Sequence, residues 1–235
     1  MTTARLLKYV RGVGETADFH DTEGEKMGSD LQFKKSSYWT AQAVVERWHY
    51  SRCMPTGKHV CFEWSCEEAP YVVAVYGNGV NPYQAAYLTK ITGLQIMNTN
   101  YLELTRLARI EPKREDAPLT KFLSLCHRAL RETGIEWIVS FSDPEQAHTG
   151  GIYRAANFFP AGKTAPEWHL IDRDGNKHHR RLAYRHSRRN DMTVAQSREE
   201  LGLLRVKTQQ KQRWLLPLNP AHRKHLQCIS HLLEC

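Results

Sequence analysis

The chain has 235 residues and a mass of 27.2 kDa, which suits one domain, or one domain with a tail, at roughly 100–200 residues per domain. Hydrophobic residues make up 41% and charged residues 25%, so a core is expected and a chain disordered throughout is excluded. The 33 Lys and Arg outnumber the 25 Asp and Glu, and the resulting net charge of +8 favours a polyanionic partner, most often nucleic acid.

Membrane insertion and export are not expected. The sequence lacks the run of about 18 apolar residues that a transmembrane helix needs. Its first ten residues hold no apolar stretch long enough for a signal peptide. The six Cys include no CxxC pair, so we expect free thiols and a cytoplasmic location.

The first part of the chain predicts an arm, a helix and a hairpin. Residues 11–36 are polar and contain four Gly, which indicates a loop or a mobile arm. A helix is predicted over 40–49, where apolar residues recur at three- and four-residue spacing. Runs of β-branched and aromatic residues at 60–64 and 70–76 predict two strands of a hairpin.

The middle of the chain predicts a strand, a helix, a strand and a short helix. Residues 101–110 alternate in character, which is typical of a strand, and residues 119–132 have the apolar spacing of a helix that ends before Gly134. A short β-rich run at 136–141 predicts a buried strand, and 151–158 predicts a short helix. Together these elements indicate a mixed α/β domain with one main sheet flanked by helices.

We expect three parts along the chain. Residues 1–36 form an N-terminal arm, residues 37–172 the catalytic domain, and residues 173–235 a basic C-terminal extension packed on that domain. Within the extension, residues 193–205 predict a helix and residues 213–216 a strand.

Polar residues capable of catalysis follow the buried strand. Asp143 stands where that strand ends, His148 lies in the next loop, and Tyr153 lies on the following helix. Ligands of open α/β sheets gather at the carboxyl ends of strands, so these side chains are candidates for acid, base or metal-ligand roles. The structural alternative is that Asp143 caps the turn and Tyr153 packs in the core.

Two further positions attract interest. His49 and Tyr50 stand at the end of the first predicted helix and are candidates for a functional role. The structural alternative is that His49 contacts the helix dipole and that the Tyr50 ring packs against the protein. Alternation places Arg106 on one strand face with Leu102 and Leu104, which are expected in the core. A buried guanidinium is costly unless an anion pairs with it, so Arg106 is expected to meet a carboxylate or an anionic ligand.

A basic stretch near the C-terminus predicts a nucleic-acid contact. Cations can neutralise phosphates, and the interleaved Tyr184 can stack on a base. The alternative is a basic hairpin that is merely solvated. The six candidate contacts are Lys177, Arg180, Arg181, Arg185, Arg188 and Arg189.

Several of these pieces resemble known families. The order of strand 102–110, helix 119–132 and strand 136–141, followed by Gly-Gly-Ile-Tyr-Arg-Ala-Ala-Asn-Phe-Phe-Pro-Ala-Gly at 150–162, resembles the second half of the GNAT acyltransferase fold. The chain more closely resembles the Mom DNA-modification proteins of Mu-like phages. That resemblance covers His49-Tyr50-Ser51, Leu104-Thr-Arg-Leu-Ala108, the helix that carries Ser124, and residues 142–157.

The resemblance implies a GNAT-like mixed central sheet with a basic C-terminal extension. It also implies an enzyme of the host cytoplasm that converts adenine in phage DNA to the N6-carbamoylmethyl (acetamido) derivative and so protects that DNA from host restriction. A bound iron ion is implied, with His49, Asp143 and Tyr153 as ligands. The implied catalytic residues are Tyr50, Arg106, Ser124, Asp143 and Tyr153.

The acyl donor is expected to differ from that of most GNAT enzymes. Their pyrophosphate lies on a glycine-rich loop before a helix, whereas residues 111–119 of this chain contain no glycine. This argues against acetyl-CoA. Glycyl-tRNA is an attractive alternative, because a glycyl group has the atoms of the final adduct.

The resemblance implies double-stranded DNA as a partner, and a glycyl-tRNA donor would add tRNA. No membrane partner is expected. The oligomeric state stays open, with a homodimer as one alternative. Two other functions remain open: an ordinary GNAT-type N-acetyltransferase and a non-enzymatic DNA-binding protein.

Overall fold

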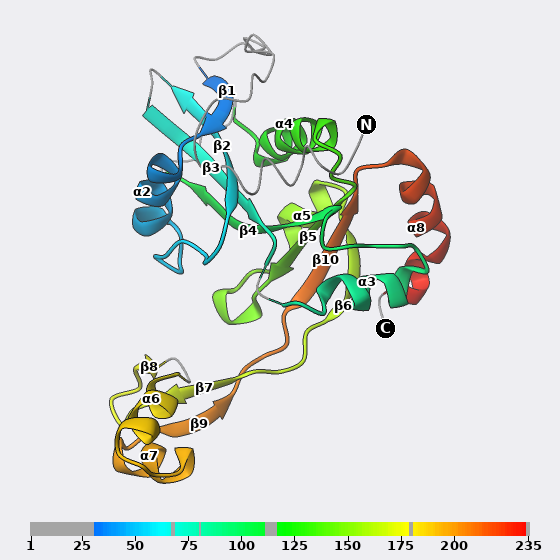
Figure 1. Cartoon of the computed structure of the whole chain (residues 1–235). Coiled ribbons are helices and arrows are strands. Elements are labelled where there is room, and N and C mark those ends of the chain that lie inside the picture. Colours follow the sequence, from blue (N-terminus) through cyan, green and yellow to red (C-terminus); the bar gives the residue numbers. More distant parts are fainter. Residues whose placement is uncertain (1–30, 67–68, 80, 111–116, 179–180, 234–235) are drawn as a thin grey trace. The chain divides into compact units, whose positions relative to one another are not determined.

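A computed structural model describes residues 31–66, 69–79, 81–110, 117–178 and 181–233, and they form two compact units (Figure 1). Unit 1 contains the described residues of 1–141, 150–162 and 213–235. Unit 2 contains those of 142–149 and 163–212, and is thus an insertion into unit 1. No helix in the described ranges is long and apolar enough to cross a membrane.

Unit 1 is built on a mixed seven-stranded sheet with the order β1-β2-β3-β4-β5-β10-β6 (Figure 1). Strands β1 to β4 pair antiparallel in succession, whereas β4 and β5 are parallel. The strands are β1 (Leu31–Ser36), β2 (His59–Cys66), β3 (Ala69–Gly77), β4 (Tyr101–Arg109), β5 (Trp137–Ser142), β6 (Phe159–Lys163) and β10 (Gln212–Pro217).

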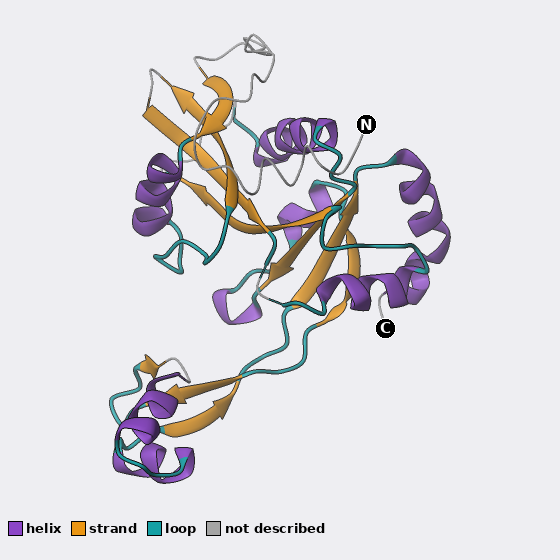
Figure 2. Cartoon of the chain, in the orientation of Figure 1, coloured by secondary structure: helices purple, strands orange, loops and turns teal. Residues whose placement is uncertain are grey.

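Helices pack against both faces of this sheet (Figure 2). They are α2 (Tyr38–Trp48), α3 (Gln84–Thr92), α4 (Leu119–Glu132), α5 (Gly151–Ala155) and α8 (Pro220–Leu233). Side chains alternate along a strand, so Ala74 and Tyr76 of β3 pack in the cluster that contains α4, whereas Val73 and Val75 pack with α2. Residues of α3 and α8 share a further cluster with Trp137 of β5.

The mixed α/β fold with one main sheet flanked by helices is confirmed, as are the elements predicted between the first helix and β5. Helix α4 has the predicted bounds, while the predicted helix at 151–158 ends at Ala155. The helices α3 and α8 and the strand β6 were missed.

The units divide the chain differently from the expected boundaries at 36 and 172. Strand β1 belongs to the sheet because it pairs with β2, and β10 lies between β5 and β6 rather than on the outside of the domain. The predicted arm is otherwise outside the described residues.

A β-bulge changes the face that β4 presents after Thr105. Arg106 lies opposite Val75 of β3, but Leu104 lies opposite the next residue, so Thr105 is the extra residue. Leu104 therefore packs on the α4 side, whereas Ala108, two residues beyond Arg106, packs on the α2 side. The expectation that Arg106 shares a core face with Leu104 was wrong, because alternation does not continue through a bulge.

Unit 2 has a three-stranded antiparallel sheet with the order β8-β7-β9. Its elements are η1 (Pro144–Gln146), β7 (Trp168–Ile171), β8 (Lys177–His178), α6 (Arg181–Arg189), α7 (Val194–Glu200) and β9 (Leu204–Lys207). A small core of Leu170, Ala183 and Leu203 joins the sheet to the helices. The helix predicted over 193–205 is α7, which starts with a capping box formed by Thr193 and Gln196. It ends earlier than predicted, at Glu200.

Candidate active site

The parallel strands β4 and β5 define the centre of the candidate site. Their pairing covers Tyr101–Glu103 and Trp137–Val139. One residue farther along, a side chain bridges the two strands, because Ser140 Oγ donates a hydrogen bond to the Leu104 carbonyl at 2.9 Å. Ser140 is buried, so this bond lies within the domain rather than on its surface.

Tyr153 reaches this bridge from α5. Its phenolic oxygen lies 2.9 Å from Ser140 Oγ and 3.4 Å from the Phe141 carbonyl. The single hydroxyl hydrogen of Ser140 is shared between the Leu104 carbonyl and the Tyr153 oxygen, and the phenol donates to the Phe141 carbonyl. Trp214 of β10 stacks on the Tyr153 ring with centroids 5.8 Å apart, which fixes the direction of the phenol.

The phenol of Tyr153 is neutral near pH 7. Burial raises its pKa, and the charges of Tyr50 and Glu103 raise it further, while the bond from Ser140 acts in the opposite direction. A neutral phenol held by hydrogen bonds can give a proton to a leaving group and recover it later.

Tyr50 directly follows the residue that caps the C-terminus of α2. His49 caps the C-terminus of that helix, and its Nδ1 lies 2.8 Å from Ser51 Oγ. The rings of His49 and Tyr50 have centroids 4.3 Å apart and are tilted by 33°. Tyr50 is 48% exposed, and repulsion between the two phenolates contributes to the raised pKa of Tyr153.

Sequence analysis missed the half-buried carboxylate of Glu103, which alternation along β4 places on the face of the sheet that Tyr101 shares with α3. Glu103 stands opposite Gly77 of β3 and Val139 of β5. A side-chain carbon at Gly79 would collide with its carboxylate. Burial and then the charge of Glu103 raise the pKa of Tyr101 to about 12. The only signal in the sequence was the Gly-Asn-Gly run at 77–79, whose closeness to Glu103 depends on strand pairing.

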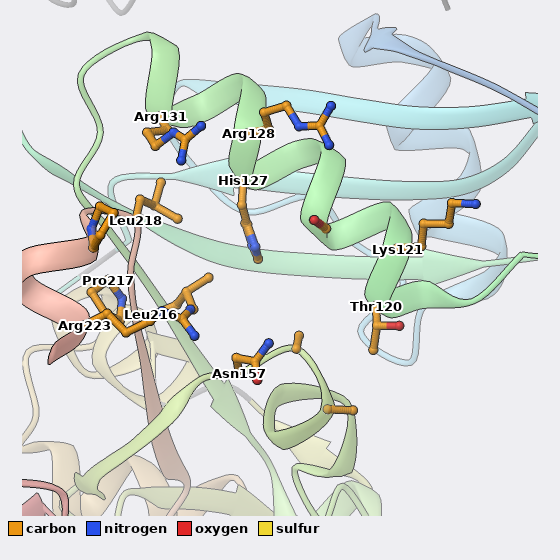
Figure 3. Close-up of a pocket in the computed structure, with 14 residues that line it drawn as sticks. Thr120, Lys121, His127, Arg128, Arg131, Asn157, Leu216, Pro217, Leu218 and Arg223 are labelled. Carbon is orange, nitrogen blue, oxygen red and sulfur yellow. The ribbon is translucent and has the colours of Figure 1, made fainter. Parts of the chain in front are cut away.

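Three other predicted site residues have contacts or surroundings of their own. The Asp143 carboxylate, in unit 2, accepts a bond from the Glu145 backbone at 3.1 Å and pairs with Lys211 at 3.0 Å. Asp143 thus caps the turn at η1, as the structural alternative predicted. The half-exposed Arg106 donates from Nε to the Cys53 carbonyl at 2.9 Å, and not to a carboxylate. Ser124 lies on α4 and lines a cavity (Figure 3).

The described residues do not fit the implied iron site. Asp143 is paired with Lys211, and His49 Nδ1 lies within hydrogen-bond distance of Ser51. In the ranges that the structure describes, no three His, Cys, Asp or Glu side chains lie together in a way that could hold a metal ion. Iron binding by His49, Asp143 and Tyr153 stays an untested prediction, and no chemical step below uses it.

The basic stretch forms one exposed stripe on α6. Arg181, Tyr184, Arg185 and Arg188 are exposed and recur at three- and four-residue spacing, whereas Ala183 and Ser187 are buried. Arg189 is also exposed at the end of the helix. Lys177 is exposed on β8 and pairs with Glu145 at 2.9 Å, and Arg180 lies outside the described residues. The basic stretch is thus mainly a helix, whereas the structural alternative to a nucleic-acid contact was a solvated hairpin.

Comparison with known proteins gives one family and several solved structures. The model of the Mom protein family matches residues 30–233, and no curated protein matches the chain significantly. An N-acetyltransferase from Staphylococcus aureus Mu50 is 10% identical, with 81% of this chain and 100% of that chain covered and a TM-score of 0.45. The ribosomal-protein-S18-alanine N-acetyltransferase from Escherichia coli is 9% identical, with 80% and 94% covered and a TM-score of 0.43.

Proposed function

This chain belongs to the Mom protein family, and on that premise we propose that it is a transferase that converts adenine in phage DNA to N6-carbamoylmethyl adenine. The observation that carries the proposal is the hydrogen-bonded chain of Tyr153, Ser140 and Leu104 where the parallel strands β4 and β5 meet. This arrangement offers a proton donor. Group transfer from an oxygen or sulfur leaving group to an amine requires one.

The proposed chemistry begins with attack by the adenine N6 on the carbonyl carbon of an activated acyl group. The new N–C bond forms, and the bond from that carbon to the leaving oxygen or sulfur breaks. Water takes the proton that N6 loses, and Tyr153 gives its proton to the leaving group. Ser140 supports Tyr153 during this exchange, because its hydroxyl can turn and donate to the phenolate that forms.

A glycyl ester of tRNA is the proposed donor. Transfer of glycyl to N6 yields an isomer of the carbamoylmethyl adduct, so a rearrangement alone completes the product without further atoms. The segment 111–116, whose lack of glycine argued against acetyl-CoA, lies outside the described residues. The donor assignment is tested by a modification assay supplied with charged glycyl-tRNA or with acetyl-CoA. Labelling of adenine that requires only acetyl-CoA would exclude the glycyl donor and favour an ordinary acetyltransferase.

The function itself is tested in cells. DNA from cells that express the protein is digested to nucleosides and analysed by mass spectrometry. We expect a modified deoxyadenosine with the mass of the carbamoylmethyl derivative, and none in cells that express Tyr153→Phe. Unmodified adenine in wild-type cells, together with DNA binding by the purified protein, would favour the non-enzymatic alternative.

The exposed stripe of α6 is proposed as the contact with DNA phosphates. For B-DNA, the slope of log affinity against log salt is about 0.9 per phosphate contact. We therefore expect the double variant Arg185→Ala/Arg188→Ala to lower the magnitude of that slope by about 2. A salt titration by fluorescence anisotropy measures it.

A control for the DNA contact removes two exposed cations of unit 1, Lys58 and Lys90. The double variant Lys58→Ala/Lys90→Ala lowers the net charge by the same amount. If both double variants change the slope equally, the effect belongs to net charge, and α6 is not the contact surface.

A further inference from the structure

Unit 2 carries a tryptophan on its surface although its core is small. Trp168, at the start of β7, is 43% exposed. Among the described residues, the buried core of unit 2 consists of Leu170, Ala183 and Leu203, and Trp168 is not part of it. Aromatic rings dominate the energetics of cores and interfaces, because each buries about 150–250 Å². A ring left outside so small a core therefore favours a role in binding.

A guanidinium lies over this ring. Arg205 Cζ is 4.0 Å from the centroid of the Trp168 ring. The register of the sheet explains the contact, because Arg205 of β9 stands opposite Leu170, two residues beyond Trp168. The two side chains are thus diagonal neighbours on one face of the sheet. Arg205 is itself exposed, so the pair offers a flat stack of ring and guanidinium to a partner.

Hydrogen bonds hold this end of β7 and β9 in one geometry. Just before Trp168, the Glu167 N–H donates to Thr208 Oγ1 at 2.9 Å. The Thr208 N–H donates in return to the Glu167 carbonyl at 2.9 Å. A side chain on a fixed backbone loses less freedom on binding than one on a loose loop. The stack is therefore preorganised for a flat partner.

Charge on the same face favours a nucleic acid as that partner. Lys207 stands opposite Trp168, so the two share a face, and Lys207 is exposed. Leu170 also lies on this face and belongs to the core that contains Ala183 of α6. The stack is thus on the side of the sheet that carries the exposed stripe of α6. Aromatic rings and guanidinium planes stack on unpaired bases, and cations beside them contact phosphates.

We propose that Trp168 and Arg205 bind an unpaired base of the DNA, which extends their stack while α6 contacts the phosphates. A base within a perfect duplex is stacked on both sides, so the surface selects DNA that is opened at one base. Enzymes that act on a base take it out of the duplex stack, and this selection suits a base-modifying enzyme. The proposal rests on the proposed contact of α6 with DNA.

Fluorescence anisotropy with the full-length protein tests the proposal on three labelled DNA probes. One is a perfect duplex, the second carries one unpaired adenine in a bulge, and the third has an abasic residue in place of that adenine. We expect the wild type to bind the adenine bulge about tenfold more tightly than the abasic bulge, because only the former can stack. Trp168→Ala should bind both bulges equally and should bind the perfect duplex as tightly as the wild type does.

Trp39→Ala is the matched control, because it removes a ring of unit 1 that is 76% exposed. It should keep the tenfold preference for the adenine bulge. Arg205→Ala leaves Trp168 in place and should lower the preference, so it tests the proposal even if Trp168→Ala does not fold. Arg185→Ala/Arg188→Ala should weaken binding of all three probes and keep the preference. Failure of the α6 contact and failure of the stack therefore give different results.

The proposal is overturned if Trp168→Ala and Arg205→Ala both keep the wild-type preference, or if Trp39→Ala loses it to the same extent. A single-stranded RNA of the same sequence serves as a fourth probe. Weaker binding of this RNA by Trp168→Ala, without any change on the adenine bulge, would assign the stack to RNA and would also overturn the proposal.

Discussion

Replacing Tyr153 by Phe is expected to lower the rate of adenine modification by about 10²–10⁴-fold, the usual contribution of a positioned general acid. The substitution removes the hydroxyl that accepts a hydrogen bond from Ser140 at 2.9 Å and leaves the ring stacked on Trp214. Stability should change little, because one hydrogen bond contributes about 1 kcal/mol. The measurement is the single-turnover rate on DNA, together with a thermal melt of each protein.

Tyr83→Phe is the matched control for Tyr153. Tyr83 also loses only a hydroxyl, but it is 76% exposed at the start of α3. Its rate should equal that of the wild type. A Tyr153→Phe protein that melts normally and retains a third or more of the wild-type rate would show that the phenol has a packing role only.

Acid is expected to destabilise the protein through His127, by about 3 kcal/mol between pH 6.5 and pH 4. In the folded state, burial and then the positive charge of Arg223 lower the pKa of this imidazole to about 3, from an ordinary value of 6.5. Above pH 6.5 the ring is neutral in both states and has no effect. Below that pH the unfolded chain binds a proton that the folded chain does not bind until the pH nears 3, so the free energy of unfolding falls as the pH falls. Each pH unit in this window removes about 1.4 kcal/mol.

Urea unfolding at several pH values, in buffers without phosphate, measures this effect. His127→Gln keeps a polar side chain but cannot titrate, so its free energy of unfolding should fall less steeply from pH 6.5 to pH 4. His231→Gln, at an exposed position of α8, should follow the wild type. Parallel curves for the wild type and His127→Gln would mean that the folded imidazole accepts a proton as readily as the unfolded one.

Local sequence patterns alone were enough to predict the central helices and strands and to recognise the family. Apolar spacing identified α2 and α4, and β-branched runs identified β2, β3, β4 and β5, because each depends on residues that are near one another in the sequence. The position of Tyr153 after β5, which underlies the proposed proton donor, was visible in the same way. The motifs that resembled the Mom family agree with the family model over residues 30–233.

The tertiary structure decided what depends on distant partners. Strand β10 lies beside β5, although 69 residues lie between the end of β5 at Ser142 and the start of β10 at Gln212. Because most of unit 2 lies between the two strands in the sequence, no local pattern shows that they are neighbours. The site of Glu103 depends on its pairing with β3 and β5, and a bulge at Thr105 reverses the faces that alternation assigns beyond it. The residues next to an Asp, Glu or Arg in the sequence do not show whether its side chain contacts a ligand, a lysine or a backbone carbonyl. Its environment is set by strand order and register, which arise from contacts between segments far apart in the chain.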